Sequence, residues 1–139
     1  MTAEVSDADL RALLRACRRV AVVGLSPKPD RASHRVAAYL QAKGFHIIPV
    51  HPQAREILGE PVYARLEDVP PPVDLVYIFR NSSEVPPFVE AAATLGPLAV
   101  WLPLGVTSRE AAEVARAHGF VLVMDRCMMI EHLRLMEEP

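Results

Sequence analysis

The chain has 139 residues, of which 51% are hydrophobic and 23% charged, and this size and balance are typical of one folded domain rather than a disordered tail. The formal net charge of −2 gives no electrostatic basis for nonspecific binding to nucleic acid or to an anionic membrane, both of which favour a strongly basic surface. We therefore expect a single domain over residues 1–139, no nucleic-acid or membrane partner, and an anion site only where cations gather locally.

Cysteine content and hydropathy indicate the compartment. Cys17 and Cys127 are the only cysteines and lack C-x-x-C spacing, which predicts neither a disulfide framework nor a zinc site. The N-terminal sequence lacks the apolar core of a signal peptide, and no segment approaches the roughly 18 uncharged residues of a spanning helix. We expect a cytoplasmic protein that is not exported.

The N-terminal quarter predicts a helix and then a buried strand. Ser6 begins the pattern S-D-A-D, with Asp9 in the capping-box position, and apolar side chains follow at helical spacing to Cys17. Residues 19–24 form a continuous apolar run that ends at a glycine. Such runs are typical of strands buried on both faces of a parallel sheet, and we interpret this one as the first and central strand.

Helices and strands alternate through the rest of the chain. Ser33 is placed to cap a helix over residues 34–43, and Gly44 is placed to end it. A strand is expected at residues 45–50, followed by a weakly patterned stretch in which residues 55–58 and 66–69 are single helical turns and residues 70–72 are a proline connector. The remaining expected strands are residues 73–79, 98–102 and 120–124, and the remaining helices run from Pro87 to Leu95, from a capping box at residues 107–110 to His118, and over residues 126–136.

This alternation predicts the fold class. Strands that alternate with helices imply right-handed βαβ crossovers and a parallel sheet covered by helices on both faces. We predict an α/β fold of the Rossmann-like, doubly wound type, with five strands in the order 3-2-1-4-5.

In such a sheet the ligand lies beyond the carboxyl ends of the strands, where the strand order reverses. We expect the site at the loops after the first and fourth strands, flanked by those after the second and third. The first loop contains cations and hydroxyls that suit a phosphate, and the N-terminus of the following helix adds free backbone N–H groups. The candidate residues taken from these loops are Gly24, Ser26, Lys28, Arg31, Ser33, His34, Arg35 and Arg80.

Gly24 fits the first glycine of a dinucleotide fingerprint, but the second and third glycines of G-x-G-x-x-G are absent. The second strand ends at His51 rather than at an acidic ribose anchor. Both features weigh against a standard NAD site, although a minimal NAD(P)-linked oxidoreductase stays as an alternative.

A set of motifs then occurs in order: GLSPKPDRASHRVAAYL, IIPVHP, ILGEPVY, DLVYIFR, AVWLPLGV and VMDRCMMIEH. Together they resemble the small stand-alone coenzyme-A-binding proteins of bacteria and archaea, over about residues 19–133. That family is similar in turn to the coenzyme-A-binding domain at the N-terminus of the succinyl-CoA synthetase α subunit. The resemblance implies a Rossmann-like domain that holds the ADP part of coenzyme A at the sheet edge.

The resemblance also implies binding positions. The synthetase loop after its first strand matches Ser26, Pro27 and Lys28, its loop after the fourth strand matches Leu102, Pro103 and Leu104, and its loop after the second matches residues 51–55. Relatives commonly have asparagine where this chain has His51, and the ligase domain that carries the phosphorylated histidine is missing. For the adenine ring we expect an apolar slot formed by Leu25, Phe79, Leu102 and Leu104.

Binding rather than catalysis is expected, because no G-x-S-x-G elbow, Walker loop or paired catalytic carboxylate is present. Cys127 at the start of the last helix offers an alternative as a reactive thiol in an acyl-transfer or thiol-redox enzyme. His132 is expected at the surface or as a capping group, and the histidine spacing indicates no metal site. The methionines of the last helix offer a contact surface for a protein partner or a second copy of the chain.

Overall fold

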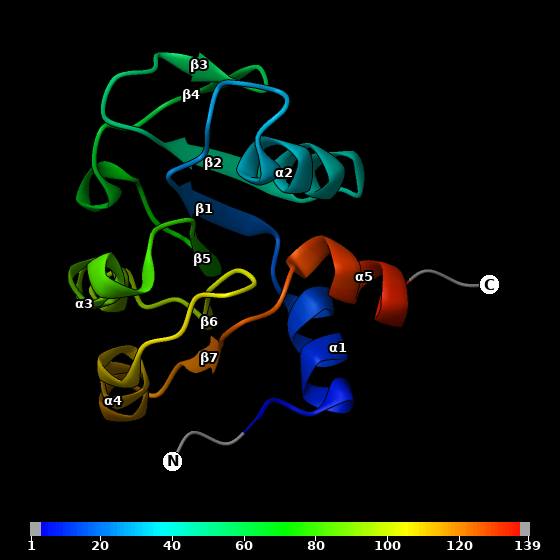
Figure 1. The fold of residues 1–139 in the computed structure, drawn as a ribbon, viewed down its shortest axis with the longest axis vertical. Coiled ribbons are helices and arrows are strands. Elements are labelled where there is room, and N and C mark those ends of the chain that lie inside the picture. Colours follow the sequence, from blue (N-terminus) through cyan, green and yellow to red (C-terminus); the bar gives the residue numbers. More distant parts are fainter. Residues whose placement is uncertain (1–3, 137–139) are drawn as a thin grey trace.

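The computed structural model describes residues 4–136 (Figure 1). Five parallel strands form its sheet: β1 (Arg19–Val23), β2 (His46–Val50), β5 (Leu75–Ile78), β6 (Ala99–Trp101) and β7 (Val121–Val123). Helices lie on both faces of this sheet, and the predicted Rossmann-like α/β class is confirmed.

The predicted strand order is wrong. The observed order is β2-β1-β5-β6-β7, so the third main strand lies on the far side of β1 from β2, and β5 rather than β1 is central. The connection from β2 to β5 contains a short 3-10 helix, η1 (Leu66–Asp68), which packs on the opposite face from the helix between β1 and β2. A right-handed connection on the opposite face must run in the opposite direction along the sheet, and this carries the chain past β1.

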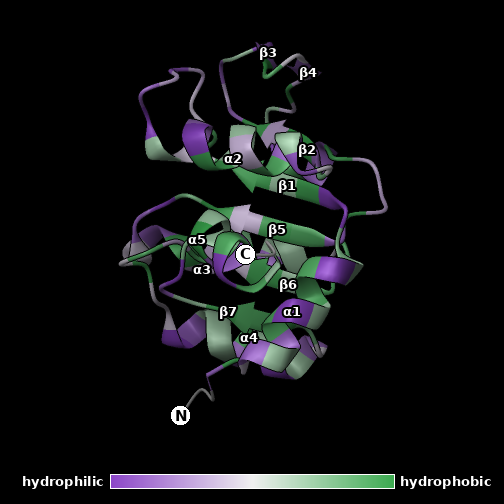
Figure 2. Cartoon of the chain, turned by 90° about the vertical axis from the view of Figure 1, so that its right-hand side faces the viewer, coloured by the Kyte–Doolittle hydropathy of each residue, from purple (hydrophilic) through white to green (hydrophobic). Residues whose placement is uncertain are grey.

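Two apolar cores separate the helices into two layers. Helices α1 (Asp7–Ala16), α2 (Ala32–Ala42) and α5 (Met128–Met136) cover one face, while η1, α3 (Val85–Ala93) and α4 (Arg109–His118) cover the other. Alternate residues of β1 contribute to each core: Val20 and Val22 to the first, Ala21 and Val23 to the second. Beyond the polar residues Arg19 and His46 that begin β1 and β2, the strands are mainly apolar (Figure 2), as is typical of strands buried on both faces.

Several local expectations are confirmed. Ser6 caps α1, because its Oγ accepts the N–H of Asp9 at 3.1 Å. Gly44 and Gly119 follow α2 and α4 with φ of 98° and 79°, the left-handed conformation in which helices commonly end. The expected turn near residue 66 is η1.

Other local expectations are wrong. Residues 55–58 form no helical turn; they belong to a hairpin of β3 (Glu56–Ile57) and β4 (Glu60–Pro61). The two residues between these strands, Leu58 and Gly59, both have positive φ, which a tight hairpin turn requires. Helix α4 is capped by Ser108, one residue later than expected, since its Oγ accepts the N–H of Ala111.

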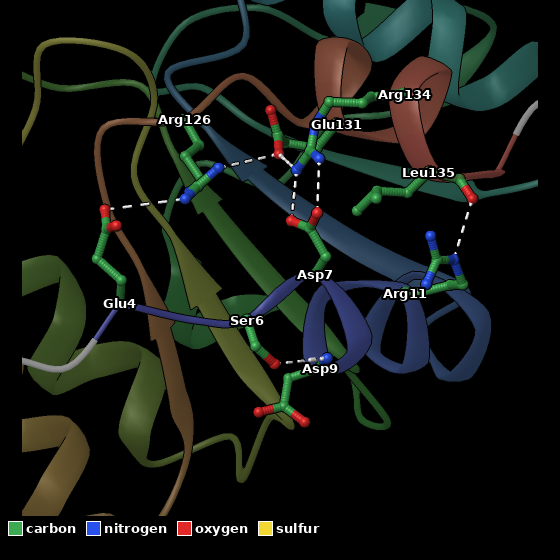
Figure 3. Close-up of polar contacts among 9 residues, drawn as sticks. All are labelled: Glu4, Ser6, Asp7, Asp9, Arg11, Arg126, Glu131, Arg134 and Leu135. Carbon is green, nitrogen blue, oxygen red and sulfur yellow. Dashed lines mark hydrogen bonds and ion pairs between the residues drawn. The ribbon is translucent and has the colours of Figure 1, made fainter.

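Ion pairs fasten α1 to α5. Arg134 donates to both carboxylate oxygens of Asp7, at 2.8 and 2.9 Å, and also to buried Glu131 at 2.6 Å (Figure 3). Arg126 pairs with the same glutamate at 3.0 Å. These contacts hold the two ends of the described chain side by side. Within residues 4–136, no helix is both long and apolar enough to cross a membrane.

Candidate functional site at the carboxyl edge of the sheet

The sheet's strand order places its switch point between β1 and β5. The chain leaves β1 toward α2 on one face and leaves β5 toward α3 on the other, so the two loops diverge and leave a crevice. A cavity of about 580 Å³ lies there, and we call it the polar cavity. It is lined by Gly24, Ser26, Arg31, Ala32, Ser33, His51, Pro52, Gln53, Phe79, Arg80, Asn81 and Glu84.

Two serine hydroxyls hold the loop after β1 in shape. Ser33 Oγ accepts the backbone N–H of Ser26 at 3.0 Å, and Ser26 Oγ accepts the N–H of Lys28 at 3.1 Å. The sequence predicted that Ser33 caps α2, and this is wrong. Ser33 instead connects the loop after β1 to the first turn of the helix. Each hydroxyl still has its own proton to donate, and both serines line the polar cavity.

The N-terminus of α2 opens on the polar cavity. Its N-cap residue, Arg31, makes no capping hydrogen bond with its side chain, and the first helical bond is donated by Arg35. The backbone N–H groups of the first helical turn therefore have no partner within the helix, and Ala32 and Ser33 line the cavity. Free N–H groups, the helix dipole and the Arg31 side chain all favour an anion here.

His51 holds the loop after β2. Its Nδ1 accepts the backbone N–H groups of Gln53 and Ala54, at 3.1 and 3.0 Å. An asparagine side-chain oxygen makes the same kind of bond in an Asx-turn. Because Nδ1 accepts, the ring proton lies on Nε2.

Arg80 supplies a second cation from the loop after β5. Its Nη2 donates to Glu84 Oε2 at 2.7 Å, while the other oxygen of Glu84 accepts the N–H of Asn81 at 3.3 Å. The guanidinium lies 5.5 Å from the Phe88 ring centroid, and its Nε is buried with no hydrogen-bond partner. The Arg80 hydrogen bond holds the pKa of Glu84 below its ordinary value, so this carboxylate is charged near neutral pH.

An apolar cavity of about 250 Å³ adjoins the polar one. Gly24, Pro52 and Arg80 line both cavities. The other residues of the apolar cavity are Val23, Val50, Ala64, Arg65, Leu66, Glu67 and Phe88. Arg80 therefore stands at the boundary between a polar space and an apolar one.

The structure separates the predicted adenine-slot residues. Leu25 and Leu102 are fully buried in the two cores, and Leu104 is 60% exposed. Phe79 does line the polar cavity, where its ring stacks on that of Tyr77 with centroids 4.4 Å apart. Among residues 4–136, the loop after β6, which includes Pro103, contributes nothing to the polar-cavity lining.

The other predicted residues lie around the first loop. Pro27 and Lys28 are exposed outside the polar-cavity lining, and His34 is half-buried in the first turn of α2. Three further residues line the cavity: Gln53 lies within the loop 51–55 that the resemblance matched, whereas Asn81 and Glu84 were not among the site residues expected from the sequence. The last two could have been found, because they form a capping box with N-x-x-E spacing around the 3-10 helix η2 (Ser82–Glu84).

The residues considered for catalysis lie elsewhere. Cys127 is half-buried immediately before α5, and its carbonyl accepts the N–H of Glu131. His132 is buried rather than at the surface: its Nδ1 lies 2.8 Å from the Tyr39 hydroxyl and its ring packs edge-on against Phe45. Residues 4–136 contain no cluster of three His, Cys, Asp or Glu side chains placed to share a metal ion.

Comparison with known proteins agrees with the geometry. A family model described as a CoA binding domain matches residues 18–133. The uncharacterized protein YneT of Bacillus subtilis is 35% identical over 91% of this chain and 94% of its own length. A hypothetical protein from Pyrococcus horikoshii is 34% identical and superposes with a TM-score of 0.92 over 99% of each chain. An ADP-forming acetate–CoA ligase of Archaeoglobus fulgidus is 29% identical over 78% of this chain, which spans 17% of the ligase.

Proposed function

This chain belongs to the family of CoA-binding domains, and on that premise we propose that it binds coenzyme A or an acyl-CoA through the ADP and pyrophosphate moiety. The ligand lies at the carboxyl edge of the sheet. In this proposal the protein is a non-catalytic carrier, sensor or regulator.

One observation carries the proposal: the uncapped N-terminus of α2 faces a cavity that also contains Arg31 and Arg80. A pyrophosphate bridges these groups well, because backbone N–H groups and guanidinium forks both bind phosphate oxygens. The hydroxyls of Ser26 and Ser33 add donors at the same place. Lys28, exposed on the outer side of the loop, suits a further phosphate such as the 3′-phosphate.

The adenine ring has a matching space. The apolar cavity adjoins the polar one and is lined by Val50, Leu66 and Phe88 among others. Arg80 at the boundary offers its guanidinium face to an aromatic ring and its edge to a phosphate. Together the two cavities, of about 580 and 250 Å³, fall in the size range of cofactor sites.

The lining of the polar cavity supports the carrier or sensor role in this proposal. Among residues 4–136, the polar-cavity lining contains no cysteine and no pair of carboxylates, so the groups that surround the pyrophosphate hold an anion rather than attack a bond. The relative named as a ligase is matched over only 17% of its length, and its activity is not assigned to this chain.

The proposal is tested by calorimetric titration with coenzyme A, dephospho-coenzyme A, ADP and NAD at fixed ionic strength. We expect coenzyme A to bind, dephospho-coenzyme A to bind more weakly because one phosphate is lost, and NAD not to bind. Failure of both coenzyme A and ADP to bind would contradict the proposal, and tighter binding of NAD would favour the oxidoreductase alternative.

Arg31→Ala tests the location of the site. Loss of one charge-assisted contact should weaken coenzyme A binding by about tenfold. Arg116→Ala removes the same charge from an exposed position near the end of α4 and serves as the matched control, with unchanged affinity expected. Equal affinities for both variants would place the anion elsewhere.

A further inference from the structure

Glu84 is the one acidic side chain among the residues that line the polar cavity, all of which lie in the described part of the chain. It lies in a space whose other charged side chains are Arg31 and Arg80. A carboxylate in this position is unexpected in a site for a polyanion. It repels the ligand's negative charge, and it pairs with an arginine that the ligand would otherwise bind.

Glu84 forms an ion pair with Arg80 in this structure. The Nη2–Oε2 distance of 2.7 Å is that of a charge-assisted hydrogen bond. The capping box holds the carboxylate in place, since its other oxygen accepts the N–H of Asn81. The N-terminus of α3 lies directly behind, because α3 begins at Val85, and this favours the charged form of the acid.

The Arg80 guanidinium is hydrogen-bonded to Glu84, but not all of its N–H donors have a partner. Its Nε is buried and has no hydrogen-bond partner, and a buried donor without an acceptor is costly. The side chain runs past Gly24, whose missing β-carbon would stand 3.6 Å from Arg80 Cδ, and its guanidinium lies over the Phe88 ring. The side chain lines both cavities at their boundary.

Building on the coenzyme A site proposed above, we propose that Glu84 is an internal competitor for Arg80, because its carboxylate occupies the Nη2 donor that a ligand phosphate would otherwise bind. The carboxylate holds Arg80 at the boundary until a phosphate replaces it, and this exchange lowers the affinity of the site for coenzyme A. Glu84 thereby acts as an affinity-setting residue that keeps binding reversible. No covalent bond changes in this exchange.

The test is a double-mutant cycle in which coenzyme A and ADP are titrated calorimetrically. Glu84→Gln keeps an oxygen acceptor for Asn81 but removes the charge, and it should tighten binding by about two- to fivefold, the range that an exposed ion pair supplies. Arg80→Met removes the guanidinium but keeps the apolar part of the side chain, and it should weaken binding. In the Arg80→Met background, the gain from Glu84→Gln should shrink markedly.

Glu90→Gln is the charge-matched control. Glu90 is exposed on α3, the helix that follows Glu84, and its substitution changes the net charge by the same amount. No change in affinity is expected. A thermal unfolding curve for each variant establishes that the protein titrated is folded.

Three outcomes would overturn the role of Glu84 alone. Weaker binding by Glu84→Gln would mean that the acid positions Arg80 for the ligand instead of competing with it. An equal gain in both backgrounds, or in Glu90→Gln, would mean that only long-range charge repulsion is removed. If the wild-type protein binds neither coenzyme A nor ADP, both the proposed function and the role of Glu84 are contradicted. If the wild type binds coenzyme A and Glu84→Gln binds it with unaltered affinity, only the role of Glu84 is contradicted.

Discussion

The carbonyl oxygen of Phe79 lies 2.6 Å from the point where a β-carbon on Gly24 would stand. This close approach joins the ends of β1 and β5 at the switch point, and the N–H of Gly24 extends the ladder to β2 by donating to Val50. Gly24 also has a φ of 78°, a conformation that costs other residues roughly 1–2 kcal/mol. The glycine is therefore required both by its backbone conformation and by its neighbour.

We predict that Gly24→Ala lowers the free energy of unfolding by about 3 kcal/mol, the sum of a conformational cost and the displacement of a backbone carbonyl. Gly119→Ala is the matched control, because Gly119 has nearly the same φ, 79°, and no atom near its missing β-carbon. Its expected cost is about 1 kcal/mol. Urea unfolding measures both, and equal costs would show that the Phe79 contact relaxes freely.

Ser33→Ala should loosen the loop after β1. The substitution removes the acceptor of the Ser26 N–H, and a partly buried donor left without a partner costs about 1–2 kcal/mol. We expect that loss in urea unfolding, together with weaker coenzyme A binding in calorimetry. Ser83→Ala, at an exposed serine of η2, should change neither the stability nor the affinity. Unchanged affinity in Ser33→Ala would show that coenzyme A binding does not depend on the order of this loop.

The Asp7–Arg134 pair predicts a pH dependence of stability. The Arg134 hydrogen bonds lower the pKa of Asp7 from its ordinary value of 3.8. A lowered folded-state pKa contributes stability that is present above the ordinary value and is lost as the pH falls through the folded one. Asp7→Asn should therefore be less stable than wild type near neutral pH, and the two unfolding midpoints should converge as the pH falls below 3.8 and through the lowered folded-state pKa of Asp7.

Asp9→Asn provides the comparison for this series. Asp9 lies in the same helical turn, and only its backbone N–H takes part in the Ser6 cap. Its unfolding midpoint should follow that of wild type across the pH range. A difference between wild type and Asp7→Asn that persists unchanged into strong acid would contradict the assignment to the ion pair.

The two cysteines should react differently with a thiol reagent in the native protein. Cys17 is fully buried, and burial raises the pKa of its thiol to about 12, so little nucleophilic thiolate forms. Cys127 is only half-buried and should be modified first, with Cys17 reacting only on unfolding. Labelling followed by mass spectrometry distinguishes the two.

Cys127→Ser should leave coenzyme A affinity within about twofold, because Cys127 lies outside the polar-cavity lining within the described chain. An unreactive Cys127 in the native protein would exclude the alternative of a thiol or acyl-transfer enzyme. A rapid reaction of this thiol, with loss of a turnover in Cys127→Ser, would favour that alternative over a carrier.

Local sequence signals predicted most helices and strands, but not which strands lie next to each other in the sheet. The apolar run of β1 is a pattern that a strand buried on both faces requires, and Gly44 and Gly119 mark the helix ends where a left-handed residue is needed. The same pattern does not state which strand pairs with which. The strand order was mispredicted because the long connection from β2 to β5 has weak periodicity, so the sequence does not show which face of the sheet this connection covers. That face decides the direction in which the chain continues along the sheet.

The sequence by itself determined the α/β class, the cations of the first loop and the expectation of a candidate site at the carboxyl edge, because these follow from periodicity, glycine positions and local charge. Only the tertiary structure decided that Arg80 meets Glu84, that an apolar cavity adjoins the polar one, and that Leu25 and Leu102 are fully buried in the cores. The physical reason is that periodicity shows only that a side chain is buried. Whether a buried side chain faces a core or a cavity depends on packing between segments that are distant in the sequence.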